Sequence, residues 1–117
     1  MTVDVYQSRT KFRNPQTTAR EVIYSCPNNY LGELALVIFT NEDASTARVM
    51  KLEVYDADRA EYHTVFYESL PAIDSFIFDR GQYIMLDPGD QIVLTSTTAN
   101  TISVTVTVKE VYVAQKT

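Results

Sequence analysis

The sequence predicts an all-β fold, an antiparallel β-sandwich of about seven to nine strands, and three observations support this prediction. Apolar and polar residues alternate in several segments, most clearly over residues 102–109. Turn-forming residues interrupt these segments at intervals of roughly 8–12 residues, as in sandwiches and barrels. No apolar period of 3.6 residues lasts longer than two turns, so no helix is expected. An Ig-like and a jelly-roll-like sandwich both fit this pattern.

The strand predictions differ in the faces that they bury. Residues 48–55 and 102–109 alternate with period two, which indicates strands with one buried face. Residues 34–40 (LALVIFT) form a continuous apolar run, which predicts a strand covered on both faces. Residues 61–70 also alternate and end before Pro71, because proline cannot donate to a central ladder. Two further short strands are predicted at residues 76–78 and 83–86.

One turn prediction is specific. In Asp87-Pro88-Gly89-Asp90, proline presets the backbone angle of the second position and glycine tolerates the positive φ that a type II turn needs at the third. We therefore expect a tight turn between the strand that ends near residue 86 and the strand that starts at Gln91.

The N-terminal segment differs from the rest of the chain in pattern and charge. Residues 1–17 lack sustained periodicity, so they are interpreted as an extended arm and residues 18–117 as the sandwich domain. The first twenty residues hold four basic side chains against one acidic one, whereas the remainder holds six against fourteen, out of a net charge of −5. A basic arm on an acidic body suggests docking on an acidic partner through Arg9, Lys11, Arg13 and Arg20. A frayed, solvated terminus explains the same charges equally well.

The residues that enzymes need are scarce, and the sequence is interpreted as a non-enzyme with no catalytic residues. The single histidine, His63, lies within a predicted strand, where a surface or packing role is commoner than general-base catalysis. With three glycines in the chain, a glycine-rich phosphate loop is not expected. The single cysteine, Cys26, reads as a small hydrophobic residue and excludes an intrachain disulfide.

Other binding functions find little support in the sequence. The turn pairs Asp56/Asp58 and Asp87/Asp90 offer oxygen ligands for calcium, but turn aspartates more often cap their own backbone, so no metal or cofactor is predicted. Tyr55, Tyr62 and Tyr67 are candidate sugar platforms, although strand tyrosines more often pack across neighbouring strands. The acidic body disfavours nucleic acid. No apolar run reaches the roughly 20 residues of a membrane span and no secretory signal is visible.

A cluster of large apolar residues accompanies a loop-rich stretch. Phe76, Phe78, Tyr83 and Met85 are candidates for an exposed patch that a partner covers. The alternative is that they close one end of the core.

The order of several motifs resembles small structural proteins of tailed bacteriophages. The resemblance starts with Val5-Tyr6-Gln7-Ser8 and Tyr24-Ser25-Cys26-Pro27, and continues with Thr40-Asn41-Glu42-Asp43, Val54-Tyr55-Asp56-Ala57 and Leu70-Pro71-Ala72. It is best at Leu86-Asp87-Pro88-Gly89-Asp90-Gln91-Ile92, followed by the alternation of residues 104–108 and by Lys109-Glu110-Val111. It covers the chain from about Val3 to Val113.

This resemblance implies a virion component made in the cytoplasm of a host bacterium. The expected role is that of a head decoration (cement) protein, a homotrimer that docks on major capsid subunits; a neck or tail attachment protein is the alternative within this class. The resemblance carries no catalytic residues over to this chain. A carbohydrate or host-surface binding module is the alternative from another class, and a small-molecule ligand is not expected.

Overall fold

The computed structural model describes residues 6–78 and 84–113, which form nine strands and no helix. The strands are β1 (Tyr6–Arg13), β2 (Glu21–Ser25), β3 (Tyr30–Asn41), β4 (Arg48–Asp56), β5 (Glu61–Leu70), β6 (Ser75–Phe78), β7 (Ile84–Leu86), β8 (Gln91–Ser96) and β9 (Ile102–Tyr112). The predicted all-β sandwich is therefore confirmed. Among the described residues there is no helix that could span a membrane.

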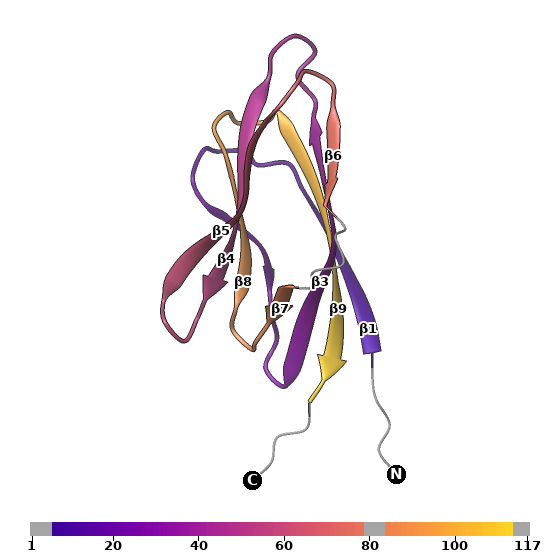
Figure 1. Cartoon of the computed structure of the whole chain (residues 1–117), viewed down its shortest axis with the longest axis vertical. Coiled ribbons are helices and arrows are strands. Elements are labelled where there is room, and N and C mark those ends of the chain that lie inside the picture. The colour runs from indigo at the N-terminus through magenta and orange to yellow at the C-terminus, as the bar shows by residue number, and fades with distance from the viewer. Residues whose placement is uncertain (1–5, 79–83, 114–117) are drawn as a thin grey trace.

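The strands form two antiparallel sheets that face each other (Figure 1). Sheet A has the order β1-β9-β3-β6, and the short β7 also pairs with β3 beside β6. Sheet B has the order β2-β8-β4-β5. Apart from the β4–β5 hairpin within sheet B, and with β7 as an addition, successive strands change sheets, and the two strand orders are those of a jelly roll. Of the two sandwich types that the sequence allows, the structure is the jelly roll.

The core lies between the sheets and is made from the inner faces of the central strands. The predicted alternation of the last strand is present, since Ile102, Val104, Val106 and Val108 are fully buried in β9. Aromatic side chains fill the end of the core near β6, where Phe66 stacks on Phe39 at 4.7 Å between ring centroids. The remaining buried apolar side chains are Ile23, Tyr24, Cys26, Leu34, Val37, Met50, Leu52, Leu70, Leu86, Ile92, Val93 and Leu94.

The apolar run of residues 34–40 is covered on one face only. In β3, Leu34, Val37 and Phe39 are buried against sheet B. Leu36 and Ile38 point to the outer side of sheet A and are only half-buried. No other element of the described chain covers that side (Figure 1). The expected second cover is missing, which makes this face a candidate for a partner.

The predicted arm differs from the structure. Residues 6–13 form β1, which pairs with β9 without interruption from Tyr6↔Val111 to Arg13↔Val104. The domain therefore starts well before residue 18, and the predicted boundary does not hold. The sequence lacked an apolar alternation here because the inner face of this edge strand carries Gln7 and basic residues rather than core side chains.

The predicted turn at residues 87–90 is present. Gly89 has φ 91° and Asp90 N–H donates to Asp87 O at 3.0 Å. The Asp90 carboxylate accepts from the backbone N–H groups of Asp87 and Ala57, at 2.9 and 3.0 Å. One side chain thus joins the β7–β8 turn to the β4–β5 turn at the same end of the sandwich.

Candidate interaction surfaces

The outer face of sheet A is almost free of charge. Phe12 of β1, Thr105 of β9, Ile38 of β3 and Ile77 of β6 are register neighbours and form one row across four strands. Phe12 is 72% exposed and Ile77 is 56% exposed. By the strand register, the same face also carries Ser8, Thr10, Leu31, Glu33, Leu36, Thr40, Ser75, Met85, Ser103, Thr107, Lys109 and Val111. Two of these are charged, and they are register partners of opposite sign.

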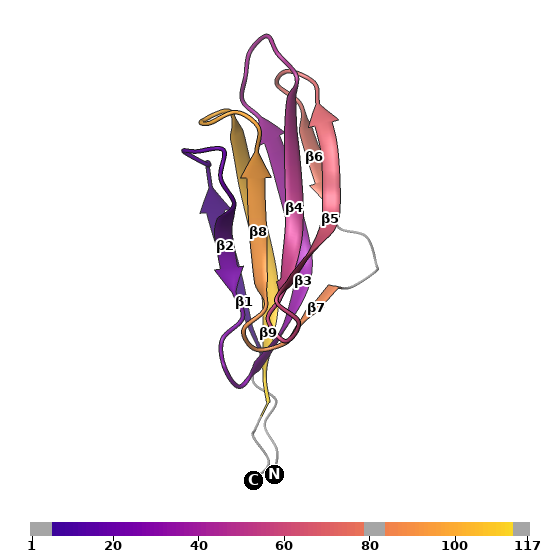
Figure 2. The same cartoon turned by 90° about the vertical axis from the view of Figure 1, so that its left-hand side faces the viewer.

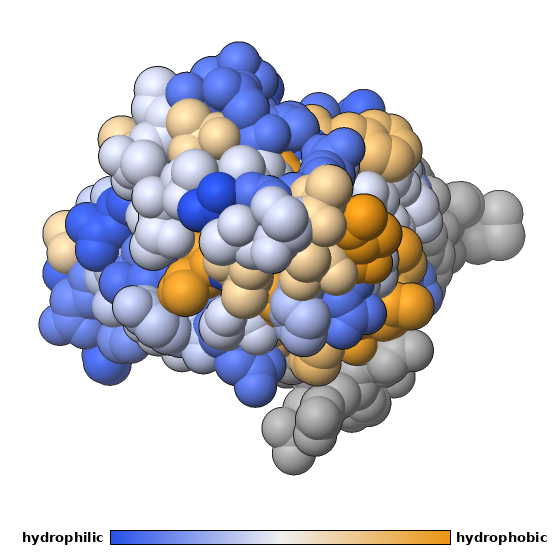
Figure 3. Space-filling model, turned by 90° about the horizontal axis from the view of Figure 1, so that it is seen from above, coloured by the Kyte–Doolittle hydropathy of each residue, from blue (hydrophilic) through white to orange (hydrophobic). Residues whose placement is uncertain are grey.

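The outer face of sheet B is different, because an ionic layer covers it. The nearly buried Glu53 carboxylate accepts from Arg20 Nε at 3.0 Å and lies 3.5 Å from Lys51 Nζ. Burial alone would raise the pKa of Glu53, but the two cations outweigh burial and lower it. Figure 3, seen from above, accordingly shows mainly hydrophilic surface on the left, where sheet B lies, and hydrophobic patches on the right, where sheet A lies.

The candidate sugar platforms belong to this ionic layer. The Arg20 guanidinium lies 3.8 Å from the centroid of the Tyr62 ring, and the Tyr55 ring packs beside Tyr62 at 4.8 Å. Tyr67 is 62% exposed, with Lys51 Nζ 6.0 Å from its ring centroid. These tyrosines pack with cations and with one another, which is the commoner of the two roles considered for them.

The predicted docking cations lie mostly at the gap between β1 and β2. Arg9, Lys11 and Arg13 share the inner side of β1, because their register partners on β9 are core valines. Arg13 reaches Glu21 of β2 at 3.6 Å and thereby bridges the two sheets. Arg9 and Lys11 line a hollow of about 400 Å³ that opens between the sheets. Arg20 does not join them, since it pairs with Glu53 on sheet B.

A buried carboxylate forms the floor of this hollow, which we call the basic hollow. Glu110 is 1% exposed and accepts hydrogen bonds from Gln7 at 2.6 Å, from Arg9 at 3.3 Å and from the Tyr24 hydroxyl. Burial alone would raise the pKa of Glu110, but these three donors outweigh burial and lower it. Burial and the hydrogen bond to Glu110 raise the pKa of Tyr24. Glu110 thus links β1, β2 and β9 as an ionised group.

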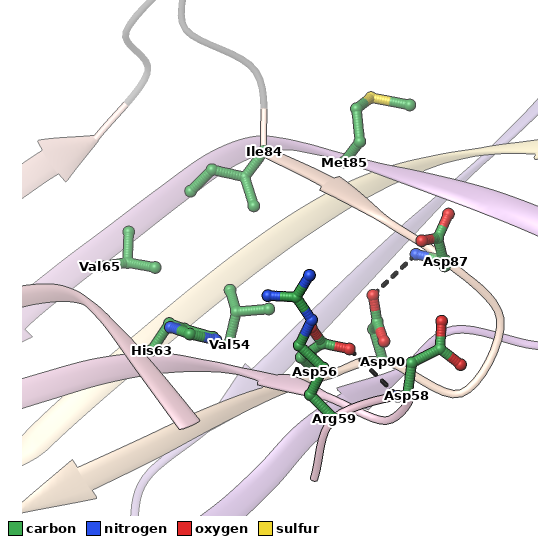
Figure 4. Close-up of a pocket in the computed structure, with 10 residues that line it drawn as sticks. All are labelled: Val54, Asp56, Asp58, Arg59, His63, Val65, Ile84, Met85, Asp87 and Asp90. Atoms are coloured by element: carbon green, nitrogen blue, oxygen red, sulfur yellow. Dashed lines mark hydrogen bonds between the residues drawn. The ribbon is translucent and has the colours of Figure 1, made fainter. Parts of the chain in front are cut away.

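On the opposite side of the sandwich a second hollow of about 490 Å³ gathers acidic groups (Figure 4). We call it the acidic hollow. The two aspartate pairs of the turns, treated separately in the sequence, meet here because the β4–β5 and β7–β8 turns are neighbours. The lining residues are Val54, Asp56, Asp58, Arg59, His63, Val65, Ile84, Met85, Asp87 and Asp90.

Two of these aspartates cap backbone groups. Asp90 accepts the two N–H groups described above, and Asp56 accepts from Asp58 N–H at 3.1 Å. His63 is more than half-exposed, lies beside Val54 in Figure 4, and is 3.4 Å from the Glu61 carboxylate. In the described residues, no three histidine, cysteine or acidic side chains are arranged to hold a metal ion. The four aspartates outnumber Arg59 in the lining, so the hollow carries a net negative charge.

The predicted apolar patch is only partly placed as expected. Met85 is 53% exposed on the sheet A face. Phe76 instead points into the core and packs on Phe66 at 4.8 Å, as the alternative interpretation required. The Phe78 side chain and Tyr83 lie outside the described residues. Ile77 was not among the predicted patch residues, although its outward position follows from strand alternation with the inward Phe76.

The single cysteine is part of the core. Cys26 is 4% exposed, and its thiol is 3.4 Å from Tyr30 O and 3.7 Å from Leu86 O. Burial raises the pKa of the thiol, which disfavours the reactive thiolate.

The sequence matches no protein-family model and no curated protein. A solved structure described as Bacillus endospore appendages that form disulfide-linked pili aligns with a TM-score of 0.57 and 9% identity, over 96% of this chain and 89% of that one. Eiger TNF from S. frugiperda aligns with a TM-score of 0.41 and 15% identity, over 82% of this chain and 65% of that one. A Clostridium thermocellum xylanase 10B with CBM22-1 and GH10 modules aligns with a TM-score of 0.42 and 9% identity, over 84% of this chain and 20% of that one. The likeness to the Bacillus protein, at 9% identity, shows the fold alone.

Proposed function

We propose that this protein is a structural subunit that docks on other proteins, and that it serves as a head decoration (cement) protein of a tailed-bacteriophage virion. The observation that carries the docking role is the outer face of sheet A, which holds one pair of opposite charges and exposes Phe12, Ile77 and Met85. The virion role is supported by the sequence resemblance described above. A neck or tail position is the alternative that the same resemblance allows.

The energetic argument concerns apolar surface. Full burial of a large apolar side chain contributes about 1.5–3 kcal/mol. Scaled by the exposed fractions of 72%, 56% and 53%, covering Phe12, Ile77 and Met85 would contribute about 3 to 5 kcal/mol. The half-buried Leu36 and Ile38 between them add to this sum. Such a contiguous apolar row with few charges is typical of the centre of a protein interface.

The fold comparison supports this role only as a precedent. By its description, the Bacillus protein with the related fold forms disulfide-linked pili. The disulfide does not carry over, because Cys26 is the single cysteine of this chain and is buried. We therefore expect noncovalent docking.

Cosedimentation with tailed-phage heads stripped of their accessory proteins tests the proposal. We expect the wild-type protein to bind and to raise the temperature at which the heads release DNA. The double variant Phe12→Ser/Ile77→Ser should lose binding, whereas the matched control Tyr67→Ser, exposed on sheet B, should retain it. If micrographs show the labelled protein on necks or tails, the neck or tail alternative replaces the head role. Absence of binding to heads, necks and tails would refute the virion role, and equal binding by both variants would refute the docking face.

A further inference from the structure

We propose that copies of this chain associate laterally through two different edges, with β1 of one copy pairing with β6 of the next. This inference rests on the proposed function, since it names one partner of an assembling subunit. The interface joins two different edges of the molecule, so it is heterologous and either closes into a ring or continues as a chain.

The sheet topology makes both pairs of edges compatible. Along the order β1-β9-β3-β6 every neighbour is antiparallel, so the outer strands β1 and β6 run in opposite directions. The same holds for β2 and β5 in sheet B. A copy shifted sideways without rotation therefore brings antiparallel edges together in both sheets (Figure 2).

The edge strands of sheet A are more regular than those of sheet B. β1 pairs with β9 over eight residues and β6 pairs with β3 over four, and neither register is interrupted. The edges of sheet B are less suited to strand addition, because the register shifts at Val22/Tyr24 in β2 and beside β5 at Leu52/Glu53. Bulges at edges oppose pairing with another chain. We therefore place the backbone pairing in sheet A.

Charge supplies the direction of the association. Arg9, Lys11 and the buried Glu110 line the basic hollow on the β1 side, and four aspartates with Arg59 line the acidic hollow on the opposite side, so the net charges of the two hollows have opposite sign. The two hollows lie at the same level, because Arg9 neighbours Val108, Val108 neighbours Leu34, and Leu34 neighbours Ile84 of the acidic hollow. The sideways shift thus places the cations of one copy opposite the carboxylates of the next. If two β1 edges, or two acidic edges, met instead, their charges would repel each other.

The apolar row of the outer face supports the same arrangement. Within one copy it begins at Phe12 on β1 and ends at Ile77 on β6. Addition of β6 to β1 brings Ile77 of one copy beside Phe12 of the next, so the row continues across the boundary. The outer side of this continued row stays open for another protein.

Analytical ultracentrifugation of the purified full chain tests the inference. At about 0.05 M salt we expect concentration-dependent oligomers, and at about 0.5 M salt a dissociation constant at least about tenfold higher. The variant Lys11→Glu alters the basic edge, and Asp58→Lys/Glu61→Lys alters the acidic edge. Each variant alone should be monomeric, and circular dichroism should show that each is folded. Glu42→Lys, a charge reversal at the far end of β3, is the control and should associate like the wild type.

Mixing the two edge variants identifies the type of interface. A heterologous interface predicts that the 1:1 mixture associates, because one variant keeps the acidic edge and the other keeps the basic edge. A mixture that stays monomeric, or a wild-type protein that stays monomeric at low salt, overturns the inference. Head binding is measured separately, so a monomer that binds heads would leave the proposed function standing.

Discussion

The Tyr24–Glu110 contact offers a quantitative test of how the β1 edge is held. In the variant Tyr24→Phe, the buried Glu110 carboxylate loses one of its three side-chain donors and keeps Gln7 and Arg9. A hydrogen bond to a buried charged group contributes about 1.5–3 kcal/mol. For a domain of 117 residues, each kcal/mol corresponds to about 4 °C in melting temperature, so we expect a decrease of about 6–12 °C at neutral pH.

The pH dependence identifies the cause. The hydrogen bonds lower the pKa of Glu110 in the folded state, so their stabilisation is present above the unfolded pKa of about 4.3 and is lost as the pH falls through the folded value. The difference in melting temperature between wild type and Tyr24→Phe should therefore be largest above about pH 5 and shrink toward about pH 3.

Thermal unfolding followed by circular dichroism at several pH values is the assay. Tyr30→Phe is the matched control, because Tyr30 packs on the Tyr112 ring and its hydroxyl makes no hydrogen bond in the described part of the chain. A loss as large in the control, or a loss in Tyr24→Phe that does not change with pH, would refute an ionised Glu110 as the origin.

Three further predictions concern stability. Deletion of residues 1–13 should lower the melting temperature by more than Tyr24→Phe does, because it removes β1 and two donors to Glu110; an unchanged melting temperature would contradict the role of β1 in the fold. Ile73→Gly should raise the free energy of unfolding by about 0.5–1 kcal/mol, measured as a higher urea midpoint, because Ile73 is an exposed β-branched residue at φ 56°. Asp43, whose pKa is lowered to about 2 by Ser45 N–H and Arg48, should contribute stability that is lost as the pH falls from about 4 toward 2. Urea titrations of Asp43→Asn should show a flatter acid limb, and an unchanged limb would count against this assignment.

Whether a strand could be predicted from the sequence depended on its position in the sheet, central or at the edge. Strands at the centre of a sheet, such as β4 and β9, bury one face and leave a clear alternation in the sequence. β1 was missed because the inner residues of an edge strand at an open gap are long basic side chains, which read as a solvated arm.

The candidate surfaces were harder to predict because they depend on contacts between distant segments. The acidic hollow joins turns about thirty residues apart, and the basic hollow joins Arg9 to Glu110 across nearly the whole chain. The apolar row is visible only once the registers of β1, β9, β3 and β6 are known. The apolar run at residues 34–40 predicted a strand covered on both faces, whereas β3 is covered on one face only in the described residues.

The pairing of Tyr6 with Val111 places the two described ends of the chain next to each other at one pole of the sandwich (Figure 1). The sheet A face and the lateral edges start near this pole and run along the length of the molecule. A peptide fused before Tyr6 or after Val113 would therefore be attached at the same pole. In the assembly proposed above, such fusions would form a row along one rim.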